Sequence, residues 1–80
     1  MKTGYFVITH DMDSVVVCFL EDKPESRKLF KDLNNCEGEE DILELWNDYN
    51  DDYPNMECWV DGKWPFNGYN IIEAFTVYQF

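Results

Sequence analysis

Residues that favour β-strands lie at the two ends of this 80-residue chain, and residues with helical spacing lie between them. Segments 5–9 and 15–20 are β-branched and aromatic runs of strand length, separated by polar residues typical of a turn. Residues 69–80 form a longer run that is largely apolar on both faces, which is typical of a central strand. The pattern predicts a sheet built from both ends of the chain, and its first two strands should form a hairpin.

Two helices are predicted in the middle of the chain. Pro24 suits a first helical turn, and Leu29, Phe30 and Leu33 follow it at spacings of three and four residues. A second helix is predicted over residues 39–50, followed by a loop that contains a proline. Its apolar stripe, extended by one residue beyond the helix, consists of Ile42, Leu45, Trp46, Tyr49 and Tyr53.

A second hairpin is predicted after the helices, because Asp61-Gly62 separates two short apolar runs. In this register Trp59 faces Trp64 across the strands. We therefore expect one α+β domain over residues 1–80, with about four strands in a small antiparallel sheet and the element order ββααββ. One or two helices should pack on one face of this sheet through Leu29, Phe30, Leu33, Ile42, Leu45 and Trp46.

The charge of the chain is concentrated in one segment. The formal net charge is −11, and residues 32–61 contain eleven of the seventeen acids and no Lys or Arg. The pairs Glu40/Glu44 and Glu44/Asp48 place like charges four residues apart, which destabilises a helix by about 0.2–0.5 kcal/mol per pair. Because a few lysines would remove this repulsion, we interpret the acidic segment as functional, with a surface that merely aids solubility as the alternative.

The polar turn after the first strand offers little for catalysis. Asp11-x-Asp13 follows an apolar run, as in the motif of haloacid-dehalogenase-type phosphotransferases, but those enzymes need further motifs on a longer domain. His10, the only histidine, lies beside it and is interpreted as a solvated turn residue. We predict that the protein is not an enzyme and uses no cofactor.

A calcium loop is also incomplete in this sequence. Residues 48–52 read D-x-N-x-D, as an EF-hand loop begins, but Tyr53 and Trp59 stand where that loop requires Gly and Glu. We therefore predict no metal site.

The cysteines do not form a recognisable framework. Cys18, Cys36 and Cys58 are odd in number and include no C-x-x-C pair, and Cys18 lies in an apolar run that predicts a core position. The apolar runs are too short for a signal peptide or a membrane span. We expect a cytoplasmic protein, in the host cytoplasm if the chain is encoded by a phage.

The net charge argues against DNA, RNA or an anionic membrane as a direct ligand, since these require a basic surface. Carboxylates four residues apart lie about 6 Å apart along a helix. A row of them presents a sparse version of the charge of a nucleic-acid duplex to a basic groove. Aromatic residues nearby in the sequence could supply anchors. The predicted partner-binding residues are Glu40, Asp41, Glu44, Asp48, Asp51, Asp52, Tyr49, Tyr53, Trp59 and Trp64.

In its length, its acidic segment 32–61 and its lack of enzymatic motifs, the chain resembles the small acidic inhibitors encoded by phages, such as anti-CRISPR and anti-restriction proteins that mimic DNA. The resemblance implies an inhibitor that blocks a basic, nucleic-acid-binding surface of a host protein. The alternative is an immunity-type or antitoxin-type protein, whose acids would neutralise a basic toxin or enzyme by direct binding.

Overall fold

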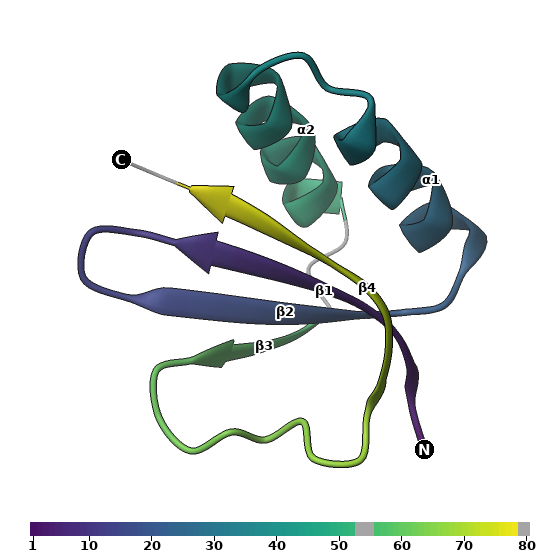
Figure 1. The fold of residues 1–80 in the computed structure, drawn as a ribbon, viewed down its shortest axis with the longest axis vertical. Coiled ribbons are helices and arrows are strands. Elements are labelled where there is room, and N and C mark those ends of the chain that lie inside the picture. Colours follow the sequence, from purple (N-terminus) through teal and green to yellow (C-terminus); the bar gives the residue numbers. More distant parts are fainter. Residues whose placement is uncertain (53–55, 79–80) are drawn as a thin grey trace.

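The structure, a computed structural model, describes residues 1–52 and 56–78. Its elements are β1 (Thr3–His10), β2 (Val15–Glu21), α1 (Pro24–Asn34), α2 (Glu39–Asp52), β3 (Glu57–Val60) and β4 (Asn70–Tyr78). The predicted α+β fold and the order ββααββ are confirmed, and the two helices lie together on one side of the sheet (Figure 1).

The four strands form one sheet in the order β3-β2-β1-β4. The pairs β1–β2 and β2–β3 are antiparallel, whereas β1 and β4 are parallel, so the expectation of a wholly antiparallel sheet is wrong for this last pair. The physical reason lies in the connection before β4. Because β3 and β4 run in the same direction at opposite edges, residues 61–69 return along the sheet instead of forming a tight hairpin (Figure 1).

Strand β4 is an edge strand, and the prediction that the final run is central is wrong. The exposed fractions of Ile71, Ile72 and Tyr78 are 54%, 49% and 51%. Within the strand as described, Val77 alone is fully buried, and Phe75 is partly buried beside the helices. The run is apolar on both faces and yet lies at an edge with little cover, since among the described strands β4 pairs only with β1.

The sheet face beneath the helices holds the larger core, and the predicted helix contacts are confirmed there. Tyr5 and Val7 from β1 and Cys18 and Leu20 from β2 point to this face, as the alternation of side chains along a strand requires. Burial of Cys18 confirms its predicted core position. The helices contribute Leu29, Phe30, Leu33 and Trp46 to the core, with Ile42, Leu43, Leu45 and Tyr49 packed against it.

The opposite sheet face is covered by aromatic side chains of β3 and of the segment 61–69. Phe66 lies at the centre of this layer, packed on Phe6 and Phe19 of the sheet. The predicted contact between Trp59 and Trp64 is present, with ring centroids 5.5 Å apart. The expected second hairpin arm is absent, however, because the chain turns inward after Gly62 to bury Phe66 instead of pairing with β3.

Candidate functional site

Helix α2 forms because its apolar residues face the core and its charged residues do not. The backbone N–H of Ile42 donates to the Gly38 carbonyl, at 3.2 Å, which closes the first turn. Acids in that turn suit the positive end of the helix dipole. The helix continues two residues past its expected end, and Asp51 and Asp52 then stand at its negative end without a basic residue in the last turn. The charges at this end oppose the dipole and do not stabilise the helix.

Six of the seven acids of α2, all except Glu39, occupy the side of the helix opposite its buried residue, Trp46. At about 100° per residue they fall within about 120° of the helix circumference, and all are exposed. Glu40, Glu44, Asp48 and Asp52 follow one another at spacings of four residues and make a ridge about 18 Å long. The name acidic surface is used below for the side chains of Glu40, Asp41, Glu44, Asp48, Asp51 and Asp52.

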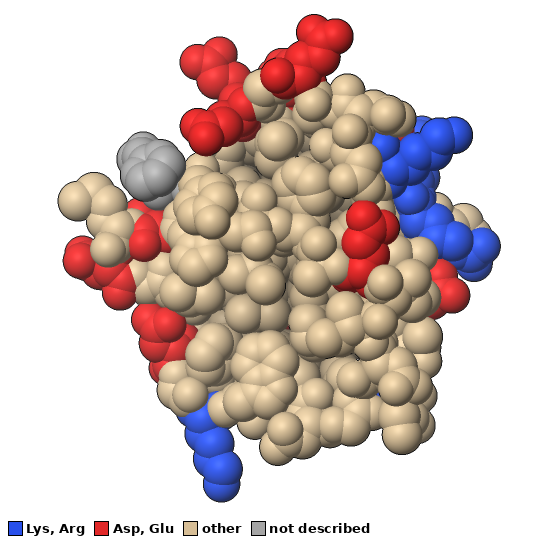
Figure 2. Space-filling model, in the orientation of Figure 1, with Lys and Arg blue, Asp and Glu red and all other residues tan. Residues whose placement is uncertain are grey.

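The acidic surface has no cationic partner within the part of the chain that the structure describes. The ion pairs there join Lys2 to Glu57 and Arg27 to Asp22, the latter at 3.0 Å, and neither uses an acid of α2. In Figure 2, acidic side chains gather around the start of α2, and Lys and Arg side chains gather at the right, over α1. The acids of α2 are therefore exposed to solvent, and among the described residues none of them forms an ion pair with the neighbouring helix.

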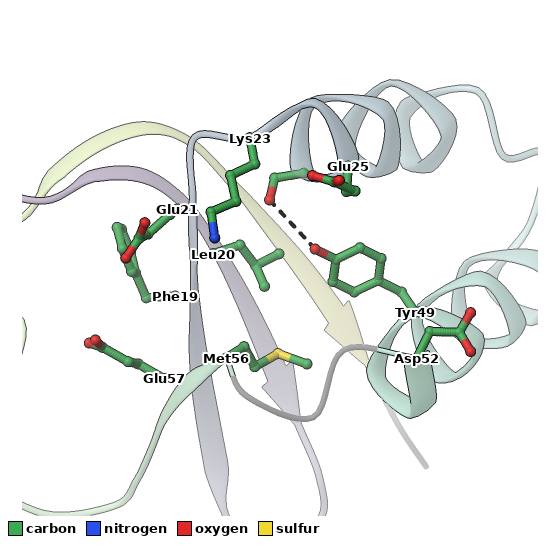
Figure 3. A pocket seen from close by; sticks show the side chains of 10 residues that line it. Phe19, Leu20, Glu21, Lys23, Glu25, Tyr49, Asp52, Met56 and Glu57 are labelled. Carbon is green, nitrogen blue, oxygen red and sulfur yellow. Dashed lines mark hydrogen bonds between the residues drawn. The ribbon is translucent and has the colours of Figure 1, made fainter.

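A cavity of about 380 Å³ lies beside the last turn of α2, between the start of α1 and strands β2 and β3 (Figure 3). Leu20, Met56 and the ring of Tyr49 provide apolar lining. Tyr49 points from α2 toward α1, where its hydroxyl lies 3.5 Å from the Ser26 Oγ. The charged residues around the cavity are Glu21, Lys23, Glu25, Asp52 and Glu57, so acids predominate.

A second hollow, of about 340 Å³, lies between the two helices, and Tyr49 lines it as well. Leu29 and Leu45 line it together with Asp48 and Asp52 of the acidic surface. Its other charged lining residues are Glu25, Lys28 and Asp32 of α1, so acids outnumber the one cation. Both hollows therefore place apolar groups next to carboxylates. This combination fits a Lys or Arg side chain, whose hydrocarbon stem packs on apolar groups while its charged head stays near water and acids.

The structure does not bring all of the predicted partner-binding residues together. Tyr49 does lie at the acidic surface, half-buried and stacked on Trp46 with ring centroids 6.0 Å apart. Tyr53 lies outside the described residues. Trp59 and Trp64 pack on the sheet face opposite the helices, so their expected place beside the acids is wrong. Their closeness in sequence is misleading because the Trp59 side chain of β3, and Trp64 with it, lie against the sheet face that carries Phe6 and Phe66.

The sequence does not predict which residues line the larger cavity. Leu20 and Met56 are distant in sequence and meet because β2 and β3 are neighbours in the sheet. The spacing of residues within one helix or strand does not predict contacts between segments that are distant in sequence.

The polar turn between β1 and β2 has the geometry of a simple connection. The backbone N–H of Asp11 donates to the Ser14 carbonyl at 3.0 Å, and its own carboxylate accepts the N–H of Met12 at 2.7 Å. His10 stacks on Tyr78 with ring centroids 5.2 Å apart. Residues 48–52, which resemble the start of a calcium loop in sequence, are helical, so they cannot wrap an ion as that loop does.

A small polar network joins the start of β3 to both the first residues and the segment before β4. The Tyr69 hydroxyl donates to Glu57 Oε2 at 2.7 Å, and Lys2 forms an ion pair with the same carboxylate. The hydrogen bond from Lys2, and after it that from Tyr69, holds the pKa of Glu57 below its usual value. The hydrogen bonds to Glu57 in turn raise the pKa values of Lys2 and Tyr69. The network is a structural tie on the side of the sheet that carries the aromatic layer.

No protein-family model, no curated protein and no solved structure matches this chain. Over residues 1–52 and 56–78, neither helix is long and apolar enough to cross a membrane. The same residues contain no group of three or more His, Cys, Asp or Glu side chains arranged to hold a metal ion.

Proposed function

We propose that this chain is a small, non-enzymatic binding protein whose acidic surface covers a basic, nucleic-acid-binding surface of a partner protein. One observation carries the proposal: six carboxylates on one side of α2 are exposed and have no cationic partner among the described residues. Two features of this arrangement destabilise the helix: its like-charge neighbours and the acids at its negative end. A role in binding explains why the acids are there. We place this binding in the cytoplasm, the host's if the chain comes from a phage.

The spacing of the acids supports mimicry of nucleic acid. The ridge of Glu40, Glu44, Asp48 and Asp52 presents a carboxylate about every 6 Å. A duplex carries a charge about every 1.7 Å, so a partner groove lined with Lys and Arg would meet a sparser version of its usual ligand. Such a field accelerates association and makes it sensitive to salt.

The two hollows beside Tyr49 add a means of holding the partner after encounter. Each offers apolar walls and nearby carboxylates to a protruding Lys or Arg side chain. Exposed charges contribute mainly to the rate of association, whereas side chains removed from water contribute to the lifetime of a complex. The acidic surface would therefore attract the partner, and the hollows would retain it.

The experiment uses the immobilised protein to capture a partner from a lysate of the source cells, followed by identification by mass spectrometry. The purified partner is then titrated with the protein while labelled nucleic acid is bound to it. We expect displacement of the nucleic acid, and we expect binding to weaken steeply between about 50 mM and about 500 mM salt, as screening shortens.

A pair of matched variants locates the interface. Glu44→Lys/Asp48→Lys should abolish capture and displacement, whereas Asp11→Lys/Asp13→Lys, which alters the net charge equally in the exposed β1–β2 turn, should retain both. Equal loss in both variants would mean that only the overall charge matters. Unchanged binding of the α2 variant would refute the proposed interface and would direct attention to the exposed edge of β4. A partner that keeps its nucleic acid but loses a catalytic activity would favour the immunity-type alternative.

A further inference from the structure

Two of the three cysteines stand directly opposite each other in the sheet. Cys18 of β2 and Cys58 of β3 are cross-strand partners in an antiparallel pair, and both are free thiols. Opposite residues in such a pair have Cα atoms about 4.5–5.5 Å apart, and their side chains point to the same face. A disulfide spans Cα separations of about 4.4–6.8 Å, so the backbone already meets the distance that the bond needs.

We propose that Cys18 and Cys58 are a redox-active pair that a low-molecular-weight disulfide, such as oxidised glutathione, converts into a reversible cross-strand disulfide. The two thiols differ in access. Cys58 lies on an edge strand and is exposed, whereas only 4% of Cys18 is exposed. An oxidant in solution therefore reaches Cys58 first.

The reaction has two exchange steps. The Cys58 thiolate attacks one sulfur of oxidised glutathione, whose S–S bond breaks, and one glutathione thiolate leaves. Cys18 then loses its proton to solvent and attacks the Cys58 sulfur, which forms the Cys18–Cys58 bond and releases the second glutathione thiolate. Two protein thiols are oxidised and one glutathione disulfide is reduced. Burial, with a smaller contribution from Cys58, raises the pKa of the Cys18 thiol, so the second step is the slow one.

The bond would secure the weaker edge of the sheet. Strand β3 has four residues and, among the described strands, pairs only with β2. It also carries Trp59, which packs in the aromatic layer on the sheet face opposite the helices. Because Cys18 and Cys58 are distant in sequence, their link also closes a long loop in the unfolded chain, which stabilises the folded state.

Cys36 provides an internal comparison. It lies after α1, where its Sγ donates to the Asp32 carbonyl at 3.2 Å, and it has no cross-strand partner because it is not in a strand. A disulfide that formed merely because thiols collide would include Cys36 as often as the other two. The geometry assigns the bond to Cys18 and Cys58 alone.

The test treats the reduced full-length chain with oxidised glutathione, blocks remaining thiols with N-ethylmaleimide in denaturant, and maps the products by mass spectrometry. Wild type and Cys36→Ser should both give a Cys18–Cys58 peptide, after a transient glutathione adduct on Cys58. Cys18→Ala should keep glutathione on Cys58, and Cys58→Ser should leave Cys18 reduced. A stable adduct on Cys58 of the wild type, with Cys18 still free, would overturn the proposal, as would a disulfide that includes Cys36.

A thermal melt tests the expected effect of the bond. The oxidised Cys36→Ser variant should melt about 10 °C or more above its reduced form, and added dithiothreitol should reverse the shift. An unchanged or lower Tm after complete formation of the bond would contradict the stabilisation of β3.

Discussion

Replacing Phe66 with alanine would remove the side chain at the centre of the aromatic layer that covers the second face of the sheet. Phe66 is 5% exposed although it lies in a segment without helix or strand. Its ring centroid lies 5.1 Å from that of Phe6 and 6.3 Å from that of Phe19, both in the sheet. It lies 5.0 Å from the ring centroid of Trp64 and 5.3 Å from that of Tyr69, both in the same covering segment. The substitution therefore removes the ring contacts through which Phe66 holds the covering segment on the sheet.

The expected loss is large for a chain of this size. Truncation of a buried Phe to Ala destabilises a protein by about 3–5 kcal/mol. We expect about 3 kcal/mol for Phe66, because the segment around it can shift to fill part of the space. An 80-residue domain is stable by about 4–12 kcal/mol in total, so this loss is at least a quarter of the whole.

The assay is equilibrium unfolding in urea, followed by circular dichroism and by tryptophan fluorescence, with linear extrapolation to water. Val60→Ala is the control, since Val60 is 60% exposed on β3 and its truncation should change the free energy of unfolding by no more than about 0.5 kcal/mol. A Phe66→Ala variant with native spectra and a loss below about 1 kcal/mol would refute the role of the layer as a second core.

Three further predictions concern single positions. Gly4→Ala should destabilise the protein by about 1–3 kcal/mol in the same urea assay, because an added Cβ would meet the backbone carbonyl of Leu20; stability within error of wild type would contradict this close approach. The lowered pKa of Glu57 means that its hydrogen bonds stabilise the fold above its usual pKa of 4.5, and that this stabilisation is lost as the pH falls below that value. Glu57→Gln should therefore lose less stability than wild type between about pH 6 and about pH 3, and identical pH profiles would exclude the effect. Glu44→Lys turns two repulsive helix pairs into attractive ones and should raise the free energy of unfolding by about 1 kcal/mol. A decrease would mean that repulsion between the acids does not destabilise α2.

Local patterns account for most of the fold that could be predicted. The first hairpin, the proline at the start of α1 and the apolar stripe of α2 each depend on residues close in sequence. The structure confirms the first two, and it confirms the stripe from Ile42 to Tyr49. The acids of α2 were predicted to face outward by the same spacing, and they are exposed.

Long-range pairing accounts for what could not be predicted. The apolar character of residues 70–78 is typical of a central strand, but the pairing of β4 with β1 alone leaves it at an edge of the described sheet. The Asp61-Gly62 pair favours a hairpin locally, but burial of Phe66 under two sheet strands outweighs that preference. The closeness of Trp59 to the acids in sequence predicts a place beside them, whereas the topology puts its side chain on the sheet face opposite the helices.

The most direct test of the proposed interface is a cross-linking map of the captured complex with a carbodiimide, which joins carboxylates to lysines that they touch. Our account predicts amide links from Glu40, Glu44 and Asp48 to lysines in the nucleic-acid-binding surface of the partner, and these links should disappear when nucleic acid is added in excess. Links that came instead from Asp11 or Glu73, with none from α2, would contradict the central claim.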